Sequence, residues 1–214
     1  MQLDRSDWNV VVVGAWNRSL FTPDRVRRHV LGLESPAKLA VQVVLDFDEP
    51  PRISYENLVI SADTRQLLVT TGVPTFESLH EAMRCASRAV AWLPETPFRA
   101  VGINVRLKVP LPSPAITKHL ASDLDFPLSD TGYEIAQRSS TRMLRRSDGS
   151  VVNVGIATAG DENALIEINF HSEASAASEI TQFLACDIDR FRRETGDLYS
   201  LITGQKLTEA LDGD

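Results

Sequence analysis

A strict alternation of apolar and polar residues near the middle of the chain is the feature that most limits its fold. In residues 98–110, FRAVGINVRLKVP, alternate positions hold Val101, Ile103, Val105, Leu107 and Val109. The polar positions between them include Asn104, Arg106 and Lys108. A period of two is typical of a β-strand that buries one face and leaves the other in solvent. The segment therefore predicts a half-buried strand with a polar open side.

The residues before this strand predict the order strand, helix, three strands, helix. The run NVVVVGAW at 9–16 is too short for a helix and rich in β-branched residues, which indicates a strand. Thr22-Pro23 is typical of a helix start. Alternating runs predict strands at 38–46, 52–61 and 66–71, and Pro74-Thr75 begins a long amphipathic helix.

The residues after position 97 repeat this order. A short helix follows Ser113-Pro114, and strands are predicted at 133–146, 150–158 and 164–171, the first two joined by the turn Ser147-Asp148-Gly149. One long helix containing Ile180 to Phe191 then closes the half. We therefore predict two repeat halves, 9–97 and 98–195, and a C-terminal tail, 196–214. The predicted fold class is α+β, with internally duplicated β-α-β-β-β-α units forming one curved antiparallel sheet with helices on one side.

Two short segments carry the internal similarity. RSLFTPDRVRRHV and VPLPSPAITKHL both place a hydroxyl residue directly before proline and a histidine late in the helix that follows. The order of elements resembles the saddle of the TATA-box-binding proteins. That resemblance implies that the first strands of the two halves lie side by side at the centre of the sheet. The segment WNRSLFTP also resembles an uncharacterised family of bacterial proteins.

The composition and net charge of the chain make some classes of function less favourable than others. The 214 residues are 43% hydrophobic and 24% charged, and the net charge is −7. An acidic chain disfavours binding to phosphate backbones. No apolar run approaches the length of a membrane span, and the polar start MQLDRSDW does not predict a signal peptide, so we expect a cytoplasmic protein. Cys85 and Cys186 lack metal-binding spacing and predict free thiols.

The first predicted strand is apolar on both faces, which indicates an interface. Val11 and Val13 alternate with Val10, Val12 and Trp16. A strand that is apolar on both sides must be covered on both, by its own chain or by a partner. We therefore expect a partner surface that includes Val11, Val13 and Trp16.

A second candidate surface is polar. On the last predicted strand Glu167, Asn169 and His171 share one side. If that side also carries Asn104, Arg106 and Lys108, the residues can bind an anionic ligand or perform acid–base chemistry. The alternative is an ordinary solvated face.

A basic stretch contains Arg138, Arg142, Arg145 and Arg146. These side chains can contact nucleic-acid phosphates. The alternative is a charged edge strand that discourages strand addition.

These patterns lead to two hypotheses from different classes. The first is a non-enzymatic protein-binding or assembly module, self-associating or bound to a protein partner, and an accessory of a bacterial defence or toxin-neutralising system. The alternative is a nucleic-acid-binding, saddle-like protein. Motifs typical of nucleotide-binding, zinc-dependent and serine-dependent enzymes are missing from the sequence, so we expect no enzyme, no cofactor and no metal.

Overall fold

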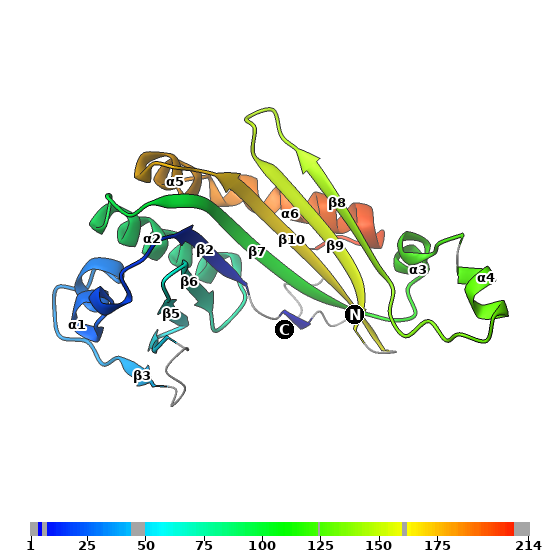
Figure 1. The fold of residues 1–214 in the computed structure, drawn as a ribbon, viewed down its shortest axis with the longest axis horizontal. Coiled ribbons are helices and arrows are strands. Elements are labelled where there is room, and N and C mark those ends of the chain that lie inside the picture. Colours follow the sequence, from blue (N-terminus) through cyan, green and yellow to red (C-terminus); the bar gives the residue numbers. More distant parts are fainter. Residues whose placement is uncertain (1–3, 6–7, 44–49, 124, 160–161, 208–214) are drawn as a thin grey trace.

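The structure is a computed structural model, and it describes residues 4–5, 8–43, 50–123, 125–159 and 162–207. Groups of consecutive strands are separated by helices, which gives a mixed α+β arrangement (Figure 1). The strands are β1 Asp4–Arg5, β2 Asn9–Gly14, β3 Ala40–Gln42, β4 Arg52–Tyr55, β5 Leu58–Ala62, β6 Gln66–Thr71, β7 Phe98–Pro110, β8 Ser139–Arg145, β9 Val151–Ala159 and β10 Asn163–Glu173. The helices are η1 Arg18–Leu20, α1 Pro23–Arg25, η2 Val26–Val30, α2 Phe76–Trp92, α3 Pro114–Leu120, α4 Asp125–Asp130, α5 Ala177–Leu184 and α6 Ile188–Thr203.

The ten strands of the described residues belong to one antiparallel sheet. Nine of them follow the order β3-β4-β5-β6-β2-β7-β10-β9-β8, and the short β1 pairs with the far end of β7. The two strands that the resemblance placed together, β2 and β7, are neighbours, with Val10 opposite Ile103. The last strand of each half, β6 or β10, lies directly beside the first strand of that half. Figure 1 shows β7 as a long curved strand through the middle of the molecule.

Helices α2, α5 and α6 cover one face of the sheet, and the described residues leave the other face open. In Figure 1 they lie behind the strands. The alternation in β7 predicted this burial correctly, because Val101, Val105 and Leu107 are fully buried whereas Asn104 and Arg106 are half-buried. The apolar faces of the sheet and the three helices form one continuous core. Burial of these side chains is the main term that stabilises the fold.

Two predicted elements are interrupted in the structure. The predicted strand 52–61 is two strands, β4 and β5, joined at Glu56-Asn57, where Glu56 has a φ of 48°. The predicted long closing helix is also two helices, because the chain leaves α5 after Leu184 and the Asp187 side chain caps α6 by accepting from the Asp189 amide at 3.0 Å. Of the predicted strand 38–46, only β3 is described as a strand, and residues 44–46 lie outside the described residues.

Candidate functional site on the open face of the sheet

Eight of the predicted surface residues lie on the same side of the sheet, opposite the helices. We call this side the open face. It carries half-buried side chains from three neighbouring central strands. They are Val11 and Val13 on β2, Asn104, Arg106 and Lys108 on β7, and Glu167, Asn169 and His171 on β10. Alternation places each set on one side of its strand, and strand pairing then brings the three sets together.

Four asparagines form a continuous row across the centre of the open face. Asn9, Asn104, Asn169 and Asn153 occupy directly paired positions on β2, β7, β10 and β9. The Asn104 amide donates to Asn9 Oδ1 at 2.7 Å, Asn169 donates to Asn104 Oδ1 at 2.6 Å, and Asn153 donates to Asn169 Oδ1 at 3.0 Å. We call this the asparagine row. Each side-chain amide has two donor hydrogens and two acceptor lone pairs, so the bonds along the row leave hydrogen-bonding capacity on the half-buried Asn104, Asn153 and Asn169.

A charged pair lies beside the asparagine row. Arg106 contacts Glu167 across the β7–β10 pair, with Nη2 2.9 Å from Oε1. Both side chains are about one-third exposed or more, so the pair contributes little to stability, about 0–1 kcal/mol. Its main effect is to fix two opposite charges in defined positions on the open face.

The polar residues of the open face do not converge on a point. His171 lies four residues from Glu167 on the same strand, which separates them by about 13 Å along β10. Arg106 bonds Glu167, whereas His171 lies opposite Gly102. A general acid and base must lie within hydrogen-bond reach of the same substrate atoms. The arrangement therefore favours an extended contact surface over an acid–base site.

The apolar end of the open face lies over the first half of the chain. Val11 pairs with Leu68 on β6, and Val13 pairs with Gln66 on β6 and Ala100 on β7. A depression of about 400 Å³ adjoins this end and is lined by the apolar Leu68 and Val59 together with the polar Arg52, Asp63, Gln66 and Thr70. Apolar side chains and a shallow depression thus occur together beside β2.

Trp16 does not belong to this surface. Its side chain is only 3% exposed, and its ring packs edge-on against Phe21 and Phe98 with centroids 5.7 and 5.6 Å apart. Its indole Nε1 donates to the Val12 carbonyl at 3.0 Å. Trp16 falls on the buried side with Val10 and Val12, so its inclusion among the partner-surface residues was wrong.

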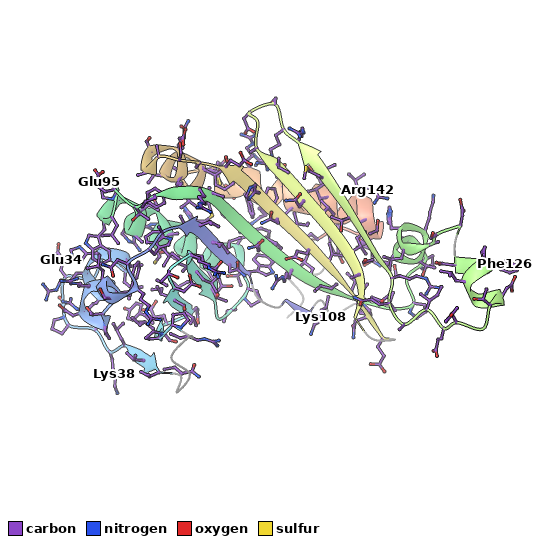
Figure 2. The ribbon with its side chains drawn as sticks, in the orientation of Figure 1. Glu34, Lys38, Glu95, Lys108, Phe126 and Arg142 are labelled. Atoms are coloured by element: carbon purple, nitrogen blue, oxygen red, sulfur yellow. The ribbon has the colours of Figure 1, made fainter. Side chains whose placement is uncertain are left out.

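The four arginines of the predicted basic stretch do not form one patch. Arg138 pairs with Asp125 at 2.9 Å, and Arg146 pairs with Glu194 on the helix-covered side. Arg142 bonds Ser140 Oγ and the Thr141 carbonyl and lies on the edge strand β8 (Figure 2). Arg145 is exposed at the end of that strand. Two of the four charges are therefore compensated by carboxylates.

Two members of the asparagine row, Asn9 and Asn153, were missed by sequence reasoning. Each is a single polar residue inside an apolar run, NVVVV or VVNV. That interruption is a usable signal, but a row forms only when strands distant in the sequence pair at matching positions. Strand alternation alone does not specify that pairing.

The described residues do not contain a group of three or more His, Cys, Asp or Glu side chains arranged to hold a metal ion. A scan against protein-family models and a search of curated proteins both find no match to the chain. Within the described part of the chain, no helix combines the length and the apolar character needed to cross a membrane.

Proposed function

We propose that this chain is a non-enzymatic protein-binding or assembly module, and that the open face of the sheet is the surface it uses. The observation that carries the proposal is the half-buried apolar end of that face, Val11 and Val13, beside the depression at Leu68. Helices bury the other side of the same strands. Apolar strand surface next to a depression is typical of a protein contact.

The charge distribution supports self-association as the simplest form of this function. The molecule as a whole carries −7, which opposes contact between two copies. The open face carries both signs, since Arg106 and Lys108 lie close to Glu167. Two copies that meet through this face therefore avoid the repulsion between the acidic surfaces on the rest of each molecule. The asparagine row supplies polar groups at the centre of such a contact.

Val13→Lys tests the proposal. Val13 is half-buried and opens to the solvent side, so the lysine ammonium can reach water and the fold is retained, with a change in unfolding free energy within about 1 kcal/mol. The added charge removes association, because a lysine buried in the contact lacks a partner. Sedimentation measures the solution mass, and urea unfolding measures the stability of the same samples.

Val73→Lys is the matched control. Val73 is 46% exposed and lies in the connection between β6 and α2, outside the strands that form the open face. Its replacement leaves both mass and stability unchanged. A wild-type protein that stays monomeric at high concentration contradicts the assembly proposal. A Val13→Lys chain that unfolds shows that Val13 belongs to the core.

A second candidate is a nucleic-acid-binding saddle, which the asparagine row favours. Side-chain amides are among the groups that hydrogen-bond to the base edges of the minor groove. Arg106 and Lys108 lie on the same face. Affinity for DNA that falls steeply between low and moderate salt supports this candidate, and affinity that does not depend on salt argues against it.

We also interpret the chain as an internal duplication. The support is the order of strands, because β2 and β7 lie together at the centre and each is flanked by the last strand of its own half. The resemblance to the TATA-box-binding proteins supplies the same arrangement. Superposition of 9–97 on 98–195 in an experimental structure tests the interpretation.

A further inference from the structure

A cavity of about 490 Å³ lies on the helix-covered side of the sheet, away from the open face. It opens where the chain breaks between α5 and α6, at Cys186 and Asp187. The β8–β9 turn, through Asp148 and Ser150, and the end of β10, through Ser172, form its other walls. Figure 1 shows α5 and α6 behind β10, so this site is independent of the surface proposed for protein binding. Its volume lies in the range of small-molecule sites.

The floor of the cavity is apolar and largely aromatic. It is formed by Ile103 on β7, Phe170 on β10, and Phe183 and Phe191 on α5 and α6. Phe170 and Phe191 are packed together, with ring centroids 4.3 Å apart. Aromatic faces carry negative charge density and attract cations as well as apolar groups.

The wall of the cavity has an excess of negative charge. Five carboxylates and two guanidinium groups line it, which leaves an excess of three negative charges. One of the two cations, Arg146, is held by Glu194 and lies over the Phe170 ring, 4.9 Å from its centroid. A cleft lined mainly by one sign of charge raises the local concentration of ions of the opposite sign.

Most of the carboxylates already have partners within the chain. Asp148 accepts from the Ser150 amide and hydroxyl, which hold its pKa below the usual range. Glu179 accepts from the backbone amides of Ser175 and Ala176. Among the described residues the Glu173 carboxylate makes no hydrogen bond or ion pair, so it is the carboxylate of the wall that remains available to a ligand.

We propose that this cavity binds an organic cation: an amine whose apolar body lies on the aromatic floor and whose ammonium group contacts Glu173. The negative wall matches the ammonium group, and Phe183, the half-buried ring of the floor, matches the apolar body. The amine is either a free small molecule or the side chain of a lysine in a partner peptide. A neutral ligand of the same shape gains the apolar contact alone.

The test is a titration of the ¹⁵N-labelled full chain with 2-phenylethylamine, followed by amide chemical shifts. We expect shifts at Glu173 and at the Cys186–Asp187 junction. At equal concentration, 2-phenylethanol and 3-phenylpropanoate produce weaker binding. The amine also slows the reaction of Cys186 with N-ethylmaleimide, whereas the rate at Cys85, which is buried away from this cavity, serves as the internal reference.

Glu173→Gln separates the charge contribution from the apolar contribution. The side chain is exposed, so the substitution keeps the fold and weakens amine binding about two- to fivefold, the contribution of one exposed charge pair. Glu34→Gln, at the far end of the molecule from α6 (Figure 2), leaves binding unchanged. Equal binding of amine and alcohol, shifts confined to other parts of the chain, or an unchanged affinity of Glu173→Gln overturns the proposal.

A second titration identifies the source of the amine. The probe is the N-acetylated, C-amidated tripeptide Phe-Lys-Phe, whose only cation is the lysine side chain. Tighter binding of the peptide than of 2-phenylethylamine assigns the site to a lysine of a partner. Tighter binding of the free amine assigns it to a small molecule.

Discussion

At the scale of single residues, the asparagine row is the most ordered polar feature of the open face. Asn104 occupies its middle and bonds both neighbours, donating to Asn9 and accepting from Asn169. Asn153 ends the row and makes one bond within it, to Asn169. Loss of a middle member removes two hydrogen bonds of the row, whereas loss of the end member removes one.

Asn104→Ala is therefore expected to lower the free energy of unfolding by about 1–2 kcal/mol. Asn153→Ala, the matched control, is expected to cost about half as much, because one hydrogen bond of the row is lost instead of two. Urea unfolding followed by far-UV circular dichroism measures both. Equal losses for the two variants would mean that the row does not act through its hydrogen bonds.

The buried thiol of Cys85 makes the free energy of unfolding depend on pH in the alkaline range. Burial is the largest cause that raises its pKa, and the nearby Arg88 opposes the effect. The folded state then holds the proton more tightly than the unfolded chain, in which a thiol titrates near about 8.5. The contribution to stability is complete below that pH and is lost as pH rises through the higher folded-state pKa. We expect the wild type to lose more unfolding free energy between about pH 7.5 and 9.5 than Cys85→Ala does. Parallel losses in the two proteins would contradict the assignment.

At the scale of elements, two breaks in predicted segments shape the molecule. The turn at Glu56-Asn57 adds a strand to the first half, and the break at Cys186–Asp187 opens the cavity under α5 and α6. Glu56 adopts a φ of 48°, in the left-handed region that favours glycine. The turn therefore contains local backbone strain at Glu56.

Glu56→Gly is expected to raise the free energy of unfolding by about 0.5–1 kcal/mol, because glycine adopts this conformation without a steric penalty. Glu56→Ala removes the same carboxylate but keeps the Cβ atom, so it isolates the backbone effect and brings no gain. Thermal unfolding of the two variants measures the difference. If alanine stabilises as much as glycine, the carboxylate and not the backbone is the source.

The sequence predicted the polar sides of the strands that form the open face, but it did not predict two breaks between elements. Alternation placed Arg106 and Glu167 on polar sides of two strands, and the structure puts those sides together. The turn at Glu56 was missed because Glu56-Asn57 lacks the glycine that marks a two-residue hairpin. The break after Leu184 was missed because Ile188 and Phe191 continue the helical spacing of apolar residues. The first site therefore carries no local turn signal, and at the second the helical spacing is interrupted by the Asp187 cap.

At the scale of the whole molecule, the two halves share one sheet and one core. β7 pairs with β2 of the first half along one side and with β10 of the second half along the other. Helix α2 contacts α5 and α6 across the same boundary. Neither half buries its apolar surface alone, so we expect them to unfold together.

The tryptophans allow a direct test of this cooperativity. All three, Trp8, Trp16 and Trp92, precede residue 98, so their fluorescence reports the first part of the chain and, through the contact of Trp16 with Phe98, its boundary with β7. Ile168→Ala, a fully buried change in β10 of the second half, is expected to cost about 2–5 kcal/mol. It should shift the fluorescence transition and the circular dichroism transition by the same amount. A fluorescence midpoint that stays in place would show that the halves unfold separately.

The asparagine row also bears on how the strands find their correct alignment. A slip of one residue between β7 and β10 would turn apolar side chains to the open face, and the hydrophobic pattern forbids it. A slip of two residues keeps every side chain on its proper face, for example by placing Ile103 opposite Ile168 instead of Phe170. Burial barely discriminates against that error. The four asparagine side chains discriminate against it, because their hydrogen bonds can all form in only one alignment of β2, β7, β10 and β9. The asparagine row therefore specifies the register of the four strands, which burial of apolar side chains does not specify.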